Sequence, residues 1–157
     1  MNDIANIKNK CIRNRLTYEC KNMLPIYNNI QVLYDEINNI TTVTIYKDSK
    51  KYTFKIAEDY PFRPPKIYYN NYSYAELLKM SGRAELLMLK KIKNRDCYCC
   101  TSFCCSENWT PTTTLTHIIN EIKQMKKIKR DLINKMLADK IIAKYLICDI
   151  SLDAWLF

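Results

Sequence analysis

Short strand-like runs that lie close together are the feature that most constrains this chain. Residues 41–46 and 51–56 alternate in polarity with a period of two, and only residues 47–50 separate them. A link of that length can close a β-hairpin. Residues 30–34 and 66–69 continue the pattern on either side. The sequence therefore predicts a four-stranded antiparallel meander.

Helical patterns flank these strands. Residues 4–24 form the first pattern, which ends at Pro25 because proline cannot continue a helix. Apolar side chains then recur along one face from Thr112 to Leu146. The mostly apolar tail, residues 147–157, is expected to pack on the core, with binding to a partner as the alternative. Together these segments predict an α+β domain. The apolar positions of the first helix are Ile4, Ile7, Cys11, Leu16, Cys20 and Met23.

A further helical segment lies between the fourth predicted strand and a cysteine-rich loop. Ser73 and Glu76 have the spacing of a capping box. Gly82 is expected to break this helix before a second piece over residues 83–92. We expect one domain over residues 1–157, with residues 72–93 as a helical insertion.

Composition excludes several classes of protein. The single glycine, Gly82, excludes the Gly-rich phosphate-binding loops, which need two or three glycines. The single histidine, His117, excludes zinc fingers and metalloproteases with paired imidazoles. A net charge of +9 favours acidic partner surfaces. The densest basic run, residues 123–130, falls on a predicted helix, so a solvated face is favoured over a nucleic-acid-binding patch.

The N-terminal residues do not resemble a signal peptide, because residues 6–14 are polar and no apolar stretch precedes them. No segment approaches the length of a membrane-spanning helix. Eight cysteines in such a chain indicate a reducing compartment. We therefore expect the protein in the cytoplasm or nucleus. We also expect it to be a monomer. The many Lys, Asn, Ile and Tyr residues, which have AT-rich codons, suit a protist or one of its large DNA viruses, in which case the host cytoplasm is expected.

Five cysteines crowd into residues 97–105, and the residues alone leave three interpretations open. One cysteine can act as a nucleophile on an exposed loop. A zinc- or redox-responsive cluster is the second interpretation, although Cys-x-Cys and adjacent cysteines are poor zinc-binding spacings. Burial as small hydrophobic side chains is the third. The five are Cys97, Cys99, Cys100, Cys104 and Cys105.

Two motifs around this loop resemble the ubiquitin-conjugating enzyme family. The stretch Tyr60-Pro61-Phe62-Arg63-Pro64-Pro65 is similar to the Tyr-Pro-Phe-Lys-Pro-Pro corner of that family, and Asn108-Trp109-Thr110-Pro111 is similar to the Trp-x-Pro turn that comes after its active-site cysteine. The order of elements also matches over residues 4–129. In this resemblance Tyr60, Pro61, Pro64, Pro65 and Trp109 are structural residues.

The resemblance implies a catalytic cysteine. In the branch with Glu-Asn-Trp-x-Pro, the cysteine lies nine residues before the tryptophan, which is Cys100 here, with Cys99 as second choice. A gap of eight falls on Thr101, which cannot form a thioester. Cys100 would accept ubiquitin, or a related modifier, from the activating enzyme and pass it to a substrate lysine or a ligase. ATP is consumed by the activating enzyme, so we expect no bound cofactor and no zinc on the cysteines.

Two departures from the family pattern bear on activity. The His-Pro-Asn of the family is missing, and Asn94, six residues before Cys100, is the remaining candidate for an oxyanion donor. Cys100 also lies 35 residues after Pro65, a longer separation than the family has. A catalytically inactive relative that binds ubiquitin or a partner is therefore the alternative function.

The resemblance also implies partner surfaces. Phe62 and Pro111 match positions that contact ligases, although Phe62 could instead fill the core. The first helix docks on an acidic domain of the activating enzyme in the family, with a solvated basic face as the alternative for this chain. Its basic residues are Lys8, Lys10, Arg13 and Arg15.

Overall fold

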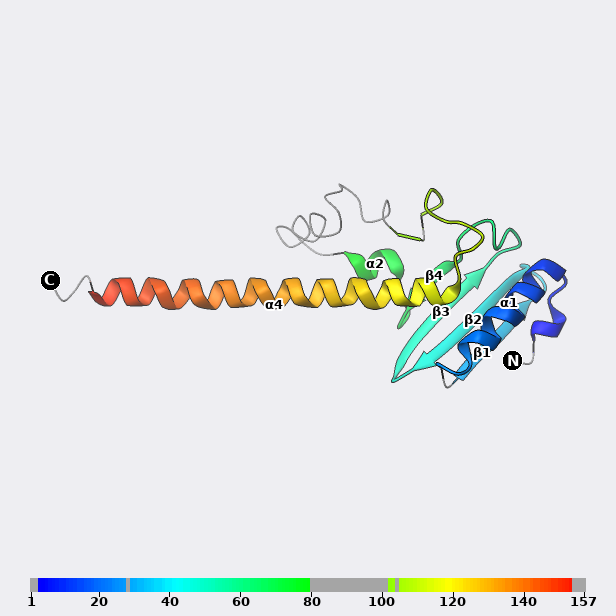
Figure 1. Cartoon of the computed structure of the whole chain (residues 1–157), viewed down its shortest axis with the longest axis horizontal. Helices are drawn as coiled ribbons and strands as arrows, with labels where there is room; N and C mark the ends of the chain where they lie inside the picture. The colour runs from blue at the N-terminus through cyan, green and yellow to red at the C-terminus, as the bar shows by residue number, and fades with distance from the viewer. Residues whose placement is uncertain (1–2, 28, 80–101, 104, 154–157) are drawn as a thin grey trace.

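The computed structural model describes residues 3–27, 29–79, 102–103 and 105–153, with the backbone alone for Leu78 and residues 145–153. An antiparallel sheet carries helices on one face (Figure 1). The elements are η1 (Ile4–Asn6), α1 (Lys10–Met23), β1 (Asn29–Asp35), β2 (Ile40–Lys47), β3 (Lys50–Ile56), β4 (Lys66–Tyr69), β5 (Tyr72–Ser73), α2 (Tyr74–Leu78) and α4 (Leu115–Asp153).

The sheet has the order β1-β2-β3-β4-β5, and every neighbouring pair is antiparallel. The predicted meander is confirmed, but the prediction of four strands missed β5. This strand has two residues, too few to show a period-two pattern. It pairs with β4 across Asn70 and Asn71, which both have positive φ angles. Asparagine tolerates that left-handed conformation better than most residues.

The hairpin predicted between β2 and β3 is also confirmed. Lys47 pairs with Lys50, so the loop contains only Asp48 and Ser49. Both have positive φ angles, 49° and 62°. Two left-handed residues form the type of turn whose twist matches that of the flanking strands.

The first helix begins later than predicted. Residues Ile4–Asn6 form a short 3-10 helix, and α1 starts at Lys10 after the side chain of Asn9 caps it by accepting from Cys11 N and Ile12 N. Cys11 is exposed and Ile12 is buried, so the predicted apolar position at Cys11 is wrong. The pattern assumed one continuous helix, whereas the new start at Asn9 changes which side chains face the sheet.

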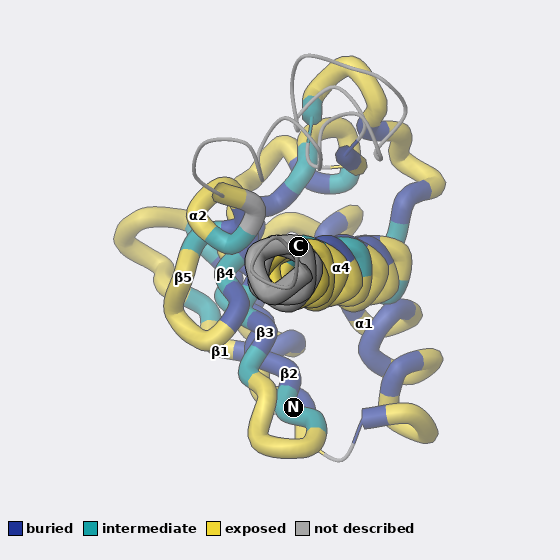
Figure 2. The backbone as a smooth tube through the Cα atoms, turned by 90° about the vertical axis from the view of Figure 1, so that its left-hand side faces the viewer, coloured by how far each residue is buried: buried dark blue, intermediate teal, exposed yellow. Residues whose placement is uncertain are grey.

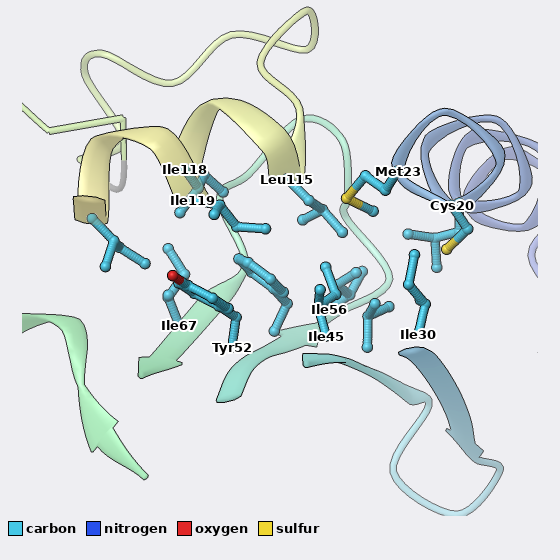
Figure 3. Close-up of a cluster of buried hydrophobic side chains, with 14 of the residues drawn as sticks. Cys20, Met23, Ile30, Ile45, Tyr52, Ile56, Ile67, Leu115, Ile118 and Ile119 are labelled. Carbon is cyan, nitrogen blue, oxygen red and sulfur yellow. The ribbon is translucent and has the colours of Figure 1, made fainter. Parts of the chain in front are cut away.

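The core lies between the sheet and the two helices that cover it, α1 and α4 (Figures 1 and 2). Figure 3 shows Ile45 and Ile56 of the sheet pointing toward Leu115 and Ile118 of α4. These four side chains are at most 1% exposed. Each such residue stabilises the fold by about 1.5–3 kcal/mol through burial. Fully buried members contributed by α1 are Leu16 and Cys20.

Helix α2 begins with the predicted capping box. The Ser73 hydroxyl accepts from Glu76 N at 3.3 Å, and the Glu76 carboxylate accepts from Ser73 N at 2.7 Å. This reciprocal pair satisfies two backbone donors at the start of the helix. The predicted break at Gly82 and the helical piece over residues 83–92 lie outside the described residues.

Helix α4 is 39 residues long, about 58 Å at 1.5 Å per residue. It starts at Leu115 rather than Thr112, because the Thr114 hydroxyl accepts from His117 N at the first turn. It continues beyond the sheet to Asp153 (Figure 1). Residues 147–153 are therefore carried away from the sheet, so the expectation that the tail packs on the core is wrong for this part of it. Residues 154–157 of the tail lie outside the described residues. Within the described part of the chain, no helix combines the length and apolarity needed to cross a membrane.

Candidate functional site

The sequence-predicted nucleophile and its neighbours lie outside the described residues. These are Cys100, Cys99 and Asn94, together with Cys97 and Cys104. On the C-terminal side of Cys100, the structure describes residues 102–103 and the stretch from Cys105 into α4. It also describes the proline-rich corner and the helices around it. The site is built from these segments.

The two motifs that the sequence singled out are in direct contact. The indole Nε1 of Trp109 donates a hydrogen bond to the carbonyl oxygen of Pro61 at 2.7 Å. Trp109 is only 7% exposed, and its ring lies 6.1 Å from that of Tyr60 between centroids. The peptide bond between Tyr60 and Pro61 is cis. Because Nε1 is the only donor on the indole, this bond fixes both the position and the orientation of Trp109.

A buried carboxylate joins α1, the corner and α4. Glu19, 3% exposed, accepts from the Tyr60 hydroxyl at 2.6 Å and from Leu115 N at 2.8 Å. It also forms an ion pair with Arg15. Burial, with the neighbouring Glu19 charge, raises the pKa of Tyr60, so this hydroxyl stays a donor. The guanidinium of Arg15 in turn donates to the carbonyl oxygen of Thr113 at 3.0 Å.

A second buried carboxylate holds the cysteine loop on α4. Glu121, 6% exposed, accepts from Phe103 N at 3.1 Å and from the Tyr74 hydroxyl at 2.7 Å. The loop is thus attached to α4 three residues after Cys100, and the same carboxylate connects it to α2. Sequence analysis missed both Glu19 and Glu121. The signal was a lone acidic residue within an apolar helix face, which is rare unless the charge is paired.

The described part of the loop is a series of tight turns. The backbone N–H of Cys105 donates to the carbonyl of Ser102 at 3.1 Å, and that of Trp109 donates to the carbonyl of Cys105 at 2.9 Å. The side-chain amide of Asn108 also donates to the Ser102 carbonyl, at 3.3 Å. Glu121 and Trp109 therefore fix the two ends of a segment that is also bonded internally.

Cysteines elsewhere in the described residues differ in reactivity. Burial raises the pKa of the Cys20 thiol to about 11, so Cys20 is neither ionised nor accessible at neutral pH. Cys11 is exposed, and Cys105 is half-buried. Among the described residues, no group of three or more His, Cys, Asp or Glu side chains could hold a metal ion. Four of the five loop cysteines lie outside that part, so the zinc interpretation stays open.

The residues matched to ligase contacts lie on the surface beside the Trp109 contact. Phe62 comes directly after Pro61 in the corner and is 74% exposed, so the alternative that it fills the core is wrong. Pro111 is exposed two residues after Trp109. Since Trp109 bonds to Pro61, the two exposed side chains belong to segments that are joined at this point.

The four basic residues of the first helix occupy different environments. Lys8 is exposed but precedes α1, and Lys10 is exposed at its first residue. Arg13 is half-buried. The side chain of Arg15 is 22% exposed and is engaged with Glu19. Unlike the two lysines, Arg15 also contacts the start of α4, because its guanidinium donates to the carbonyl oxygen of Thr113.

Comparison with known proteins supplies one match. The model of a family described as ubiquitin-conjugating enzyme matches residues 2–145 of this chain. No curated protein and no solved structure matches this chain.

Proposed function

This chain belongs to the ubiquitin-conjugating enzyme family, and we propose that it carries ubiquitin, or a related modifier, as a thioester on Cys100. The family match itself supports a role in ubiquitin conjugation in general terms. The choice of cysteine, the thioester step and the partners are our proposal. Cys99 is the second choice for the nucleophile.

The contact between Trp109 and Pro61 carries this proposal. Cys100 lies nine residues before Trp109, the separation expected of the nucleophile in the branch with Glu-Asn-Trp-x-Pro. The indole hydrogen bond attaches this part of the chain to the corner. Glu121 attaches Phe103, closer still to Cys100, to α4. Because the acyl group of a thioester is already activated, the enzyme mainly needs to hold the reacting groups in a fixed geometry.

The proposed chemistry has two steps that conserve atoms and charge. The Cys100 thiolate attacks the carbonyl carbon of the modifier's C-terminus, and the thiolate of the activating enzyme leaves. A lysine amine of the substrate, or a ligase cysteine, then attacks the same carbon, and the Cys100 thiolate leaves. The attacking group loses its proton to solvent or a nearby base. ATP is consumed earlier, by the activating enzyme.

Asn94 is the proposed donor to the oxyanion that forms in each step. Removing one such donor lowers the rate by about 10²–10³ in other enzymes. The variant Asn94→Ala should therefore slow transfer from Cys100 to an amine while leaving thioester formation detectable.

The exposed residues suggest how partners bind. Phe62 and Pro111 are exposed apolar side chains on two joined segments, and together they would suit contact with a ligase. Lys8, Lys10 and Arg13 remain the basic residues proposed to contact an acidic domain of the activating enzyme.

An inactive relative is the second candidate function. It is favoured by one observation in the sequence, the absence of His-Pro-Asn before the cysteine loop. Such a protein would bind ubiquitin or a partner without forming a thioester.

The decisive experiment mixes the full chain with activating enzyme, ATP and ubiquitin and resolves the products on non-reducing gels. An adduct that a thiol reductant cleaves is expected. Cys100→Ser should convert it into a reductant-resistant ester, and Cys100→Ala should abolish it. The matched control is Cys105→Ala, which removes a half-buried cysteine of the same loop and should leave the adduct intact.

Other outcomes overturn parts of the proposal. An adduct that survives Cys100→Ala but not Cys99→Ala moves the nucleophile to Cys99. No adduct with any variant, together with measurable ubiquitin binding, supports the inactive relative. Stoichiometric zinc in the purified protein would support the metal-binding interpretation of the loop cysteines.

A further inference from the structure

The half of α4 beyond the sheet carries an exposed apolar row. Ile133, Leu137 and Ile141 are spaced four residues apart and are 39%, 53% and 55% exposed. Residues four apart lie above one another on a helix, so the three form one continuous ridge. Figure 1 shows this part of α4 extending past the sheet. The ridge is therefore left without cover by the described elements.

The same side of the helix is positively charged. Arg130, Lys140 and Lys144 are exposed, and each lies three residues from a member of the ridge. Among the described side chains, none of the three pairs with a carboxylate. We call these six residues the ridge face: Arg130, Ile133, Leu137, Lys140, Ile141 and Lys144.

Acidic residues lie on the opposite side. Lys135 is two residues from Leu137 and therefore lies about 160° around the helix from Leu137. Asp131 and Asp139 are each four residues from Lys135, so they lie on the same side as Lys135. These three form a separate row that holds two carboxylates and one cation. The ridge face thus combines three aliphatic side chains with three cations and no carboxylate.

We propose that the ridge face binds an acidic amphipathic helix of another protein. A ridge with four-residue spacing fits the groove of a second helix. Carboxylates beside that groove would meet Arg130, Lys140 and Lys144, which favours association and sets its orientation. The proposal is independent of Cys100, because it rests on α4 alone.

Charge disfavours two other occupants of the face. A second copy of this chain would bring the same three cations against its partner. Residues 80–101 of the chain itself contain five basic and two acidic residues, so they too are positively charged. A lipid surface is disfavoured because exposed aliphatic side chains are not confined to one side of the helix. Ile142, 55% exposed, lies on the side of Lys135.

Fluorescence anisotropy with the full chain tests the proposal. The probe is a labelled helical peptide with leucines four residues apart and glutamates beside them. The control peptide carries lysines in place of the glutamates. The acidic peptide should bind, more weakly as salt is added, and the lysine peptide should not.

Two pairs of variants compare the faces of the helix. Leu137→Gln should weaken binding by about tenfold through lost apolar burial, whereas Ile142→Gln should change it less than about twofold. Lys140→Glu should weaken it by about fivefold, whereas Lys135→Glu, with the same change in net charge, should have a smaller effect. Circular dichroism of each variant checks that the helix is retained.

Several results would overturn the proposal. Equal effects within each pair, or equal binding of the two peptides, would mean that the ridge face does not recognise the partner. Tighter binding of anionic vesicles or of single-stranded RNA, lost in Leu137→Gln and Lys140→Glu, would replace the helix with that ligand. Self-association that depends on Leu137 in sedimentation experiments would replace it with a second copy.

Discussion

Glu19→Ala should lower the free energy of unfolding more than either Tyr60→Phe or Glu121→Ala. The change removes the acceptor of both the Tyr60 hydroxyl and Leu115 N, and it leaves the Arg15 guanidinium without its carboxylate. Removing one member of a buried ion pair costs about 3–5 kcal/mol. Arg15 is 22% exposed, so water recovers part of that loss.

We therefore expect a loss of about 3–4 kcal/mol for Glu19→Ala. Glu19→Gln keeps the volume and one carbonyl acceptor, and should lose about 2 kcal/mol. Tyr60→Phe deletes one donor and should lose about 1–2 kcal/mol. In the double variant Glu19→Ala with Tyr60→Phe, the losses should fall short of the sum by about 1 kcal/mol, because both single changes break the same bond.

Urea unfolding monitored by circular dichroism at neutral pH measures these values. Glu36→Ala, which removes an exposed glutamate from the turn after β1, is the matched control and should stay within about 0.5 kcal/mol of the parent. If Glu19→Ala is no more destabilising than Glu36→Ala, the carboxylate does not hold α1, the corner and α4 together, and the reasoning fails.

Three further predictions concern Glu121, Ser49 and Cys20. Glu121→Ala should destabilise the fold by about 2–3 kcal/mol and speed hydrogen exchange at the Phe103 amide, because it leaves that N–H without an acceptor. Exchange rates measured by NMR check this, and an unchanged rate at Phe103 would contradict it. Ser49→Gly should stabilise the fold by about 0.5 kcal/mol in urea unfolding. Glycine relieves the strain of the left-handed backbone, and this gain exceeds the cost of the extra conformational freedom that glycine gives the unfolded chain. A loss of stability would contradict the prediction. The Cys20 pKa, raised by burial from 9.0 to about 11, means that between these pH values the unfolded chain releases a proton that the folded chain keeps. The stability that this group contributes is complete below pH 9 and falls as the pH rises toward 11. The free energy of unfolding measured across that range should therefore decrease. The decrease per pH unit should be the same in the control variant Cys11→Ser.

Elements with many residues in a repeating pattern were predictable from the sequence. Residues 41–46 and 51–56, which lie within β2 and β3, alternate in polarity, and the short link between them indicates the hairpin. The corner and the Trp-x-Pro turn were recognised because their residue types and order are characteristic of one family. Family membership, confirmed by the match over residues 2–145, therefore depended on local sequence.

Elements set by one cap or by two residues were not predictable in this way. The strand β5 is too short for a pattern. Cys11 was assigned to the apolar face because the helix was assumed to begin at Ile4. The Asn9 side chain instead starts α1 at Lys10, and one cap then decides which residues are buried.

The amino-acid sequence by itself determined the order of α1, the four strands β1 to β4 and α4, the two motifs at the corner and the turn, and the separation of Cys100 from Trp109. Only the tertiary structure decided that Glu19 and Glu121 hold these parts in place, because their partners lie far away in the chain: Leu115 is 96 residues from Glu19, and Tyr74 is 47 residues from Glu121. Patterns along a chain report contacts between near neighbours. A buried carboxylate is satisfied by whichever donors the packed helices and sheet bring to it, and that is known only once the chain has folded.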